Sequence, residues 1–156
     1  MIIKILATWF GCGYSKWAPG TVGTVGALPL VVGLFLLPDL VYMAVSLLLT
    51  LLAIVISILH EKQLGVHDSR EIVIDEVAGF VIAMTWLPMT WQSFLGAFLV
   101  FRLLDALKPF PIGLLDKKVQ GGFGVVLDDV AAGLITNVLL QIVYVKTNWL
   151  GVQIQL

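Results

Sequence analysis

The sequence predicts an all-α fold: a compact, membrane-associated bundle of helical hairpins in a single domain over residues 1–156. Hydrophobic residues make up 60% of the chain and charged residues only 12%. The mean hydropathy of +1.04 is far above that of a soluble domain. Long uncharged runs alternate with short charged segments, and none of the runs shows the strict polar–apolar alternation of a strand.

The charge balance and the cysteine content narrow the possible partners. Nine Lys and Arg residues against ten Asp and Glu residues give a net charge of −1. This balance lacks the basic excess of a nucleic-acid-binding domain, so no nucleic-acid partner is expected. Because Cys12 is the only cysteine, the sequence predicts neither a disulfide within the chain nor a cysteine zinc site.

The first part of the chain predicts one helical hairpin. Residues 1–20 are expected to form an interfacial lead-in that ends in the turn Pro19-Gly20. Residues 21–37 and 40–59 are uncharged, and we expect two antiparallel helices joined by a tight turn at Pro38-Asp39. The second run has the length that crosses a hydrocarbon layer of ~30 Å.

A charged segment over residues 65–76 follows. Asp68 is predicted to cap a helix, with Glu71 three residues later as its reciprocal partner. Glu71 and Asp75 would then lie one turn apart on one face of that helix. His60 is expected at the end of the preceding helix.

Residues 77–101 carry no charge, yet we expect a broken hairpin here rather than one crossing. Pro88 disfavours helix at its own position and at the one before it. The two pieces would each be about 15–20 Å long, too short to cross a bilayer alone. A hairpin also keeps the basic residues on one side, which the positive-inside rule makes cytoplasmic: Lys4, Lys16, Lys62, Arg70, Arg102, Lys108, Lys117 and Lys118.

Two further stretches combine charge with helix-ending signals. Arg102 and Asp105 share a helix face at a spacing of three, and Pro109 ends that helix after Lys108. Later, Asp128 and Asp129 stand side by side between the glycine-rich residues 121–124 and an uncharged run over residues 130–145. We expect the last helix to consist of that run, so that the aspartate pair lies between the glycine-rich turn and the helix.

The acidic residues are predicted to meet at helix ends on the cytoplasmic surface. Burying a lone carboxylate is costly unless it is paired, protonated or bound to a cation, and adjacent carboxylates favour a divalent metal. Mg²⁺ with oxygen ligands, beside Arg102, Lys108 and the Gly20-Thr21 turn, suits phosphoryl transfer. The expected metal ligands are Asp75, Glu76, Asp105, Asp128 and Asp129.

Simpler interpretations of the same residues exist. Each acidic pair could be a solvated helix end, Arg102–Asp105 an ion pair at the membrane boundary, and Lys108 a snorkelling side chain. Glycines spaced by three at Gly20, Gly23 and Gly26 could serve only helix packing. A membrane protein that binds or transports a cation without catalysis would explain the acids, but it gains nothing from Arg102 and Lys108.

Four sequence motifs resemble those of one known family, the bacterial phosphatidylglycerophosphatase A family. They occur in family order over residues 18–133. They are Ala18-Pro19-Gly20-Thr21; His67-Asp68 with Ile74-Asp75-Glu76 and Gly79; Phe101-Arg102, Asp105, Lys108-Pro109 and Pro111-Ile112; and Gly121-Gly122, Gly124-Val125, Asp128-Asp129 and Ala132-Gly133.

The resemblance implies a multi-pass or deeply inserted enzyme of the bacterial inner membrane that acts on a lipid of the bilayer. Its activity would be the Mg²⁺-dependent hydrolysis of phosphatidylglycerophosphate to phosphatidylglycerol and phosphate in phospholipid biosynthesis. A phosphatase of another lipid, such as prenyl phosphate or phosphatidate, is the alternative. The implied catalytic residues are Asp128, Asp129, Asp105 and Glu76; the implied phosphate-binding residues are Arg102, Lys108, Thr21, Gly20 and Gly122.

Overall fold

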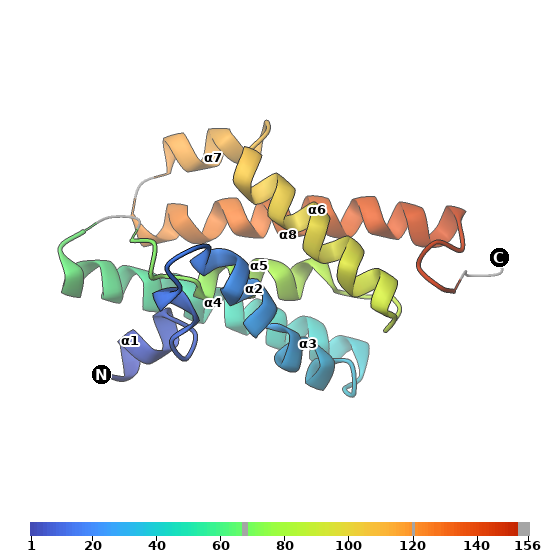
Figure 1. Ribbon diagram of the computed structural model, residues 1–156, viewed down its shortest axis with the longest axis horizontal. Helices are drawn as coiled ribbons and strands as arrows, with labels where there is room; N and C mark the ends of the chain where they lie inside the picture. Colours follow the sequence, from blue (N-terminus) through green and yellow to red (C-terminus); the bar gives the residue numbers. More distant parts are fainter. Residues whose placement is uncertain (67–68, 120, 153–156) are drawn as a thin grey trace.

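The structure is a computed structural model that describes residues 1–66, 69–119 and 121–152. The described residues form helices and no strand, which confirms the predicted all-α class (Figure 1). Its elements are α1 (Ile2–Ala7), the 3-10 helix η1 (Cys12–Tyr14), α2 (Pro19–Gly26), α3 (Leu28–Leu34), α4 (Asp39–Leu64), α5 (Ile74–Ala83), α6 (Trp91–Leu107), α7 (Ile112–Lys118) and α8 (Gly122–Lys146).

Helix α5 is the centre of the bundle. Eight of its ten residues are buried, and it packs against α2, α4, α6 and α8. Helices α4 and α8 run the length of the molecule in opposite directions (Figure 1). The ends of the helices that carry the charged residues therefore gather at one end of the bundle, where α2, α5 and α8 begin and α4 and α6 finish.

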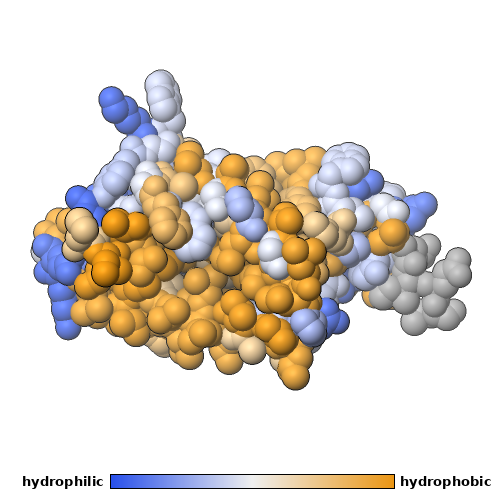
Figure 2. Space-filling model, turned by 90° about the horizontal axis from the view of Figure 1, so that it is seen from below, coloured by the Kyte–Doolittle hydropathy of each residue, from blue (hydrophilic) through white to orange (hydrophobic). Residues whose placement is uncertain are grey.

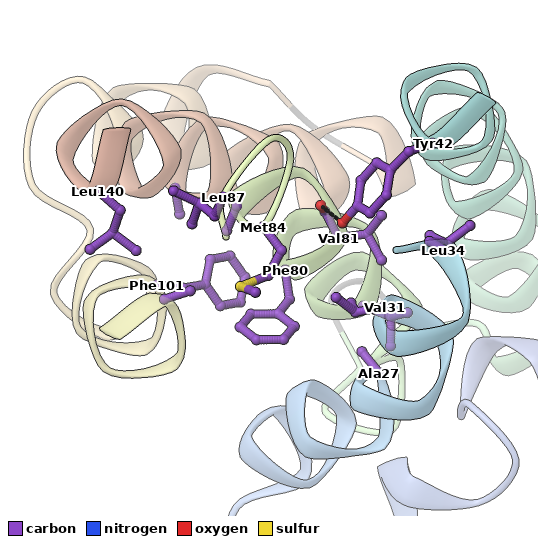
Figure 3. Packing of buried hydrophobic residues seen from close by; sticks show 14 of the residues in the cluster. Ala27, Val31, Leu34, Tyr42, Phe80, Val81, Met84, Leu87, Phe101 and Leu140 are labelled. Carbon is purple, nitrogen blue, oxygen red and sulfur yellow. Dashed lines mark hydrogen bonds between the residues drawn. The ribbon is translucent and has the colours of Figure 1, made fainter. Parts of the chain in front are cut away.

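The hydrophobic core lies between α5 and the helices around it (Figure 3). The rings of Phe80 and Phe101 are 6.1 Å apart, and Leu140 of α8 belongs to the same cluster. The buried hydroxyl of Tyr42 donates a hydrogen bond of 2.8 Å to the carbonyl of Val81. This bond ties the start of α4 to α5 without leaving a buried polar group unsatisfied.

Proline explains where several helices stop and start. The expected break around Pro88 is confirmed, since α5 ends at Ala83 and α6 begins at Trp91. The single helix expected over residues 21–37 is instead two helices that meet at Ala27. Pro29 lacks the N–H that a continuous helix would need and its ring crowds the preceding turn, so α3 starts anew with Pro29 in its first turn.

Two predicted helix starts were wrong. Helix α5 begins at Ile74 and not at Asp68, which lies outside the described residues with His67. Helix α8 begins at Gly122 and not at Val130, so that Asp128 and Asp129 lie inside the helix and not between the glycine-rich turn and its start.

The outer surface is largely apolar. Figure 2 shows hydrophobic side chains over most of one long face, with hydrophilic residues gathered towards its ends. On α4, the leucines at positions 47, 48, 51 and 52 are all exposed. Helices α4 and α8 are long and apolar enough to cross a membrane, and together with this surface they indicate that the protein associates with a membrane.

Candidate active site

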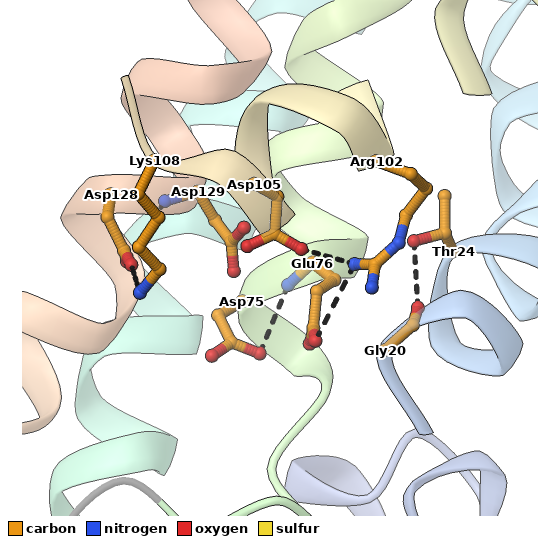
Figure 4. Close-up of polar contacts among 9 residues, drawn as sticks. All are labelled: Gly20, Thr24, Asp75, Glu76, Arg102, Asp105, Lys108, Asp128 and Asp129. Atoms are coloured by element: carbon orange, nitrogen blue, oxygen red, sulfur yellow. Dashed lines mark hydrogen bonds and ion pairs between the residues drawn. The ribbon is translucent and has the colours of Figure 1, made fainter. Parts of the chain in front are cut away.

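A polar pocket of about 440 Å³ opens at the charged end of the bundle. Its walls come from the start of α2 and the segment before it, the start of α5 and the segment before it, the end of α6, and the start of α8 and the chain before it. Figure 4 shows the charged side chains that α5, α6 and α8 contribute. The charged residues that line it are Arg70, Asp75, Glu76, Arg102, Asp105, Lys108, Asp128 and Asp129. The pocket therefore brings together three acidic positions that are far apart in the sequence: Asp75-Glu76, Asp105 and Asp128-Asp129.

Two glycines bring the acidic ends of α5 and α8 together. A Cβ at Gly79 would lie 2.6 Å from the carbonyl oxygen of Asp129, and a Cβ at Gly133 would lie 2.2 Å from the carbonyl oxygen of Gly79. No larger residue fits such a close approach of two backbones. The contact places Asp75 and Glu76, at the start of α5, beside Asp129 on the facing side of α8.

Asp75, Glu76 and Asp129 form a compact group of carboxylates. One ligand atom from each lies within 4.8 Å of the others, and Asp75 and Asp129 are each only 4% exposed. Glu76 Oε2 and Asp129 Oδ1 are buried and have no hydrogen-bond partner. Orphaned carboxylate oxygens that converge in this way fit a hard divalent cation, which takes oxygen ligands and offsets the repulsion.

Burial and mutual repulsion act on the two carboxyl groups of α5. Burial raises the pKa of Asp75 well above its ordinary value, and the neighbouring Glu76 carboxylate raises it further. Burial also raises the pKa of Glu76, although the Arg102 guanidinium nearby opposes this shift. The metal-free group therefore favours protonation, and a bound cation would favour its ionised form.

The two other aspartates of the pocket, Asp105 and Asp128, form ion pairs with basic side chains. Arg102 Nη1 forms an ion pair with Asp105 Oδ2 and lies 4.0 Å from Glu76 Oε1. Lys108 Nζ lies 2.5 Å from Asp128 Oδ2, and Lys108 adopts a left-handed backbone conformation (φ 44°) that ends α6. The ion pair between Arg102 and Asp105, which the simpler interpretation predicted, is therefore present. Arg102 and Lys108 nevertheless also line the pocket.

The start of α2 closes the pocket on the Arg102 side. A Cβ at Gly20 would lie 2.2 Å from Glu76 Oε1 and 3.0 Å from Arg102 Nη1. The buried Thr24 hydroxyl donates a hydrogen bond of 2.8 Å to the carbonyl of Gly20, one turn back. Glycine at position 20 therefore lets the helix start reach the acidic group, whereas Gly23 and Gly26 serve packing against Val73 and Cys12.

Two of the expected phosphate-binding residues do not line this pocket: Thr21 and Gly122. Gly122 instead lies against α4, where an added Cβ would come within 2.5 Å of the backbone nitrogen of Ile58. Its small size is explained by the crossing of α8 over α4.

The structure adds pocket residues that the sequence did not single out as site residues. Ser69, Arg70 and Trp17 all line the pocket. Arg70 is a cation three residues after His67, so the clustering of charge in that segment was the available signal. Glu71, which was expected to share a helix face with Asp75, instead pairs with the buried His60, with Glu71 Oε1 2.7 Å from His60 Nε2.

The arrangement can bind a phosphate monoester. Three carboxylates can hold a cation at one side of the cavity, and Arg102 and Lys108 can neutralise phosphate oxygens at another. Asp105 and Asp128 orient these two cations. Such a site spreads the charge that develops during phosphoryl transfer to water.

Comparison with known proteins gives one consistent family. The model of the family described as Phosphatidylglycerophosphatase A matches residues 5–144. An Escherichia coli phosphatidylglycerophosphatase A is 37% identical over 146 residues, which cover 93% of this chain and 84% of that protein. The Haemophilus influenzae protein of the same name is 40% identical over 134 residues, covering 85% and 82% of the two chains.

A third relative differs in its assigned substrate. It is a Bacteroides thetaiotaomicron protein, provisionally named a phosphatidylinositol-3-phosphatase, which is 31% identical over 145 residues, covering 88% of this chain and 91% of the relative. No solved structure matches the chain with significance.

Proposed function

The chain belongs to the phosphatidylglycerophosphatase A family, a family of phosphoric monoester hydrolases, and from that premise we propose that it hydrolyses phosphatidylglycerophosphate to phosphatidylglycerol and phosphate. The reaction would serve phospholipid biosynthesis in the bacterial inner membrane. One observation carries the proposal: the acidic group and two cations share a single pocket at the end of an apolar bundle.

In this proposal Asp75, Glu76 and Asp129 hold Mg²⁺. Their unpartnered oxygens and their close spacing support this assignment. When bound, Mg²⁺ would act as a Lewis acid that neutralises charge on the phosphoryl oxygens. Asp105 and Asp128, also expected as ligands, serve instead to orient Arg102 and Lys108.

Side chains of the pocket bind the phosphate and transfer the proton. Arg102 and Lys108 bind the phosphate and orient it, with Gly20 leaving room for it beside Arg102. Water attacks the phosphorus as the bond between phosphorus and the glycerol oxygen breaks. The proton of the water passes to the carboxylate of Glu76 or Asp129 and from there to the departing glycerol oxygen. The leaving group is the glycerol hydroxyl of the lipid, which stays in the bilayer.

The position of the pocket suits a lipid substrate. It lies where α4 ends and α8 begins, so the headgroup can reach the acidic group while the acyl chains remain among lipids. The basic residues at this end of the bundle support a cytoplasmic orientation by the positive-inside rule.

The test is release of phosphate from lipid in mixed micelles, with Mg²⁺ or with EDTA. We expect activity only with the metal, and a loss of at least ~100-fold in Asp75→Asn and Asp129→Asn. Asp39→Asn, an exposed carboxylate at the far end of α4, is the matched control and should keep full activity. Full activity in both site variants would contradict the proposed site.

A substrate panel tests the lipid. It contains phosphatidylglycerophosphate, phosphatidylinositol 3-phosphate, phosphatidate and a prenyl phosphate. We expect the first to be preferred, and a preference for the second would assign this chain the activity named for its Bacteroides relative. Flux of divalent ions into liposomes without phosphate release would support cation transport instead.

A further inference from the structure

A second cavity lies on the outside of the bundle, between the α2–α3 pair and α6. It is an open groove of about 460 Å³ whose lining is almost entirely apolar. We call it the α2–α6 groove. The residues that line it include Val25, Leu28, Val32, Phe94, Leu95 and Phe98.

The α2–α6 groove is built on two helices, α2 and α6, that also line the polar pocket. Gly20 and Arg102 line the polar pocket, and a Cβ at Gly20 would lie 3.0 Å from Arg102 Nη1. Val25 stands five residues beyond Gly20, and Phe98 stands four residues before Arg102. On α6, Phe98 in the groove therefore stands one helical turn from Arg102 in the polar pocket, on the same face of the helix.

The distance from Arg102 in the polar pocket to the far end of the groove is about the thickness of one leaflet of a bilayer. The far end of the groove is lined by Trp91, eleven residues before Arg102 on α6, which corresponds to about 16 Å along the helix. A bilayer has a hydrocarbon core of ~30 Å, so each leaflet is about 15 Å thick. A chain that starts at the pocket and follows the groove would span that depth.

The lining requires an apolar occupant. Leu95 is 48% exposed and Val25 47% exposed, and no charged residue occurs from Gly20 to the end of α3 or in α6 before Arg102. Exposed apolar area of this kind is stabilised by contact with hydrocarbon. Because the groove lies one helical turn of α6 from Arg102 in the polar pocket, a fitting occupant is a molecule that has hydrocarbon at one end and phosphate at the other.

We propose that the α2–α6 groove binds one acyl chain of the phospholipid whose phosphate occupies the polar pocket. This assignment rests on the proposed function and adds to it a site that selects for a long-chain lipid. Phe98 lies next to the first carbons of the chain, and Leu95, Phe94 and Val32 contact carbons further along it. The groove thereby aligns the headgroup with Arg102 before hydrolysis.

Photo-crosslinking of the full-length protein tests the location directly. The probe is phosphatidylglycerophosphate with a diazirine midway along one acyl chain, in vesicles of unlabelled lipid. We expect labelling concentrated in residues 25–32 and 91–98, and competed by excess phosphatidylglycerophosphate. Labelling spread evenly over the exposed leucines of α4 and α8 would overturn the proposal, as would crosslinks between two copies of the chain through these residues.

Kinetics with a matched pair of variants test the consequence. Leu95→Trp narrows the groove, and Leu139→Trp places the same side chain on α8 at a residue of similar exposure, 45%, which does not line it. We expect Leu95→Trp to lower kcat/KM for the dioleoyl lipid about tenfold through KM. Its activity on a dihexanoyl analogue, whose chains are too short to fill the groove, should be unchanged, and Leu139→Trp should alter neither.

The outcomes separate the two proposals. An equal effect of both variants on the dioleoyl lipid would overturn the groove assignment while leaving the phosphatase intact. Absence of phosphate release by the unmodified protein from both lipids would overturn the proposed function, and crosslinking would still decide whether the groove binds the chain. If Leu95→Trp fails to fold, the crosslinking result, obtained on the unmodified protein, decides alone.

Discussion

The five carboxylates of the pocket fall into two groups that differ in their neighbours. Asp105 and Asp128 are paired with Arg102 and Lys108, so their charges are compensated within the chain. Asp75, Glu76 and Asp129 have no equivalent full compensation and converge on one another. This division separates the residues that we propose hold the metal from those that orient the phosphate-binding cations.

Stability should depend on pH through Asp75 and Glu76. Because their pKa values are raised in the folded state, the fold binds these protons more tightly than the unfolded chain. In EDTA their contribution to stability is therefore favourable at low pH and is lost as the pH rises above about 4 towards the raised values. We expect Mg²⁺ to raise Tm, and to do so most at the upper end of this range.

Thermal unfolding in detergent over a pH series, with EDTA or with Mg²⁺, measures this effect. Asp75→Asn removes one of the two groups, so the fall of Tm with pH in EDTA should be shallower in that variant. A steeper fall than in the unmodified protein would show that Asp75 is not a source of this dependence.

Lys108 combines a charge with a strained backbone. Its left-handed conformation (φ 44°) costs a non-glycine residue about 1–2 kcal/mol. Lys108→Ala and Lys108→Gly both remove the ammonium, so both should raise KM for the phosphorylated lipid by a similar factor. Only glycine relieves the strain, and we expect Lys108→Gly to be more stable than Lys108→Ala by about 1 kcal/mol.

Chemical unfolding of the two variants measures that difference without interference from the lost ion pair, which is common to both. Equal stabilities would indicate that the backbone at position 108 relaxes. Lys146→Ala, at the exposed end of α8, should leave KM unchanged.

At the scale of elements, the crossing of α5 and α8 builds the acidic group. Gly79 and Gly133 allow their backbones to touch, which sets the distance between Asp75 and Asp129. The positions of the α8 carboxylates, Asp128 and Asp129, therefore depend on this backbone contact. A shift of α8 by the size of one methyl group would move both of them relative to α5.

Gly79→Ala should therefore affect both stability and activity. The new methyl group would meet the Asp129 carbonyl and the ring of Phe101, and overpacking of this kind costs about 1–3 kcal/mol. Gly33→Ala is the matched control, since nothing lies within 4 Å of its added Cβ and alanine favours a helix by up to ~1 kcal/mol. Thermal unfolding and phosphate release measure both effects; an active, fully stable Gly79→Ala would contradict the close crossing.

At the scale of the whole molecule, the bundle is apolar outside and polar at one end. Helix α4 has 26 residues, about 39 Å, so it can cross a hydrocarbon layer of ~30 Å with both ends in water. The last turn of α4 lies at the same end of the bundle as the start of α8, and its first turn lies towards the other end (Figure 1).

Labelling of single cysteines tests this orientation. In a Cys12→Ser background, Asp39→Cys should react with an impermeant maleimide added to intact cells. Lys62→Cys, on the pocket side, should react only after the membrane is permeabilised. Reaction of both from outside would exclude a crossing by α4 and, with it, the proposed cytoplasmic pocket.

The sequence alone determined the helical class, the break before α6 and the identities of the charged residues. These features follow from composition and from proline, which act within a few residues of chain. The family resemblance, confirmed by the comparisons, added the expected chemistry. The roles of the individual site residues stay predictions that the experiments above test.

Apart from the Arg102–Asp105 pair, which the sequence predicted and the structure contains, only the tertiary structure decided which charged residues are neighbours. The local pattern placed Glu71 with Asp75, whereas in the fold Glu71 pairs with His60. It also placed Asp128 and Asp129 ahead of the last helix, whereas they lie inside α8 and line the pocket. The reason is that helix crossings such as the one between Gly79 and Gly133 are set by packing across the bundle, and these contacts leave no periodic signal in the chain itself.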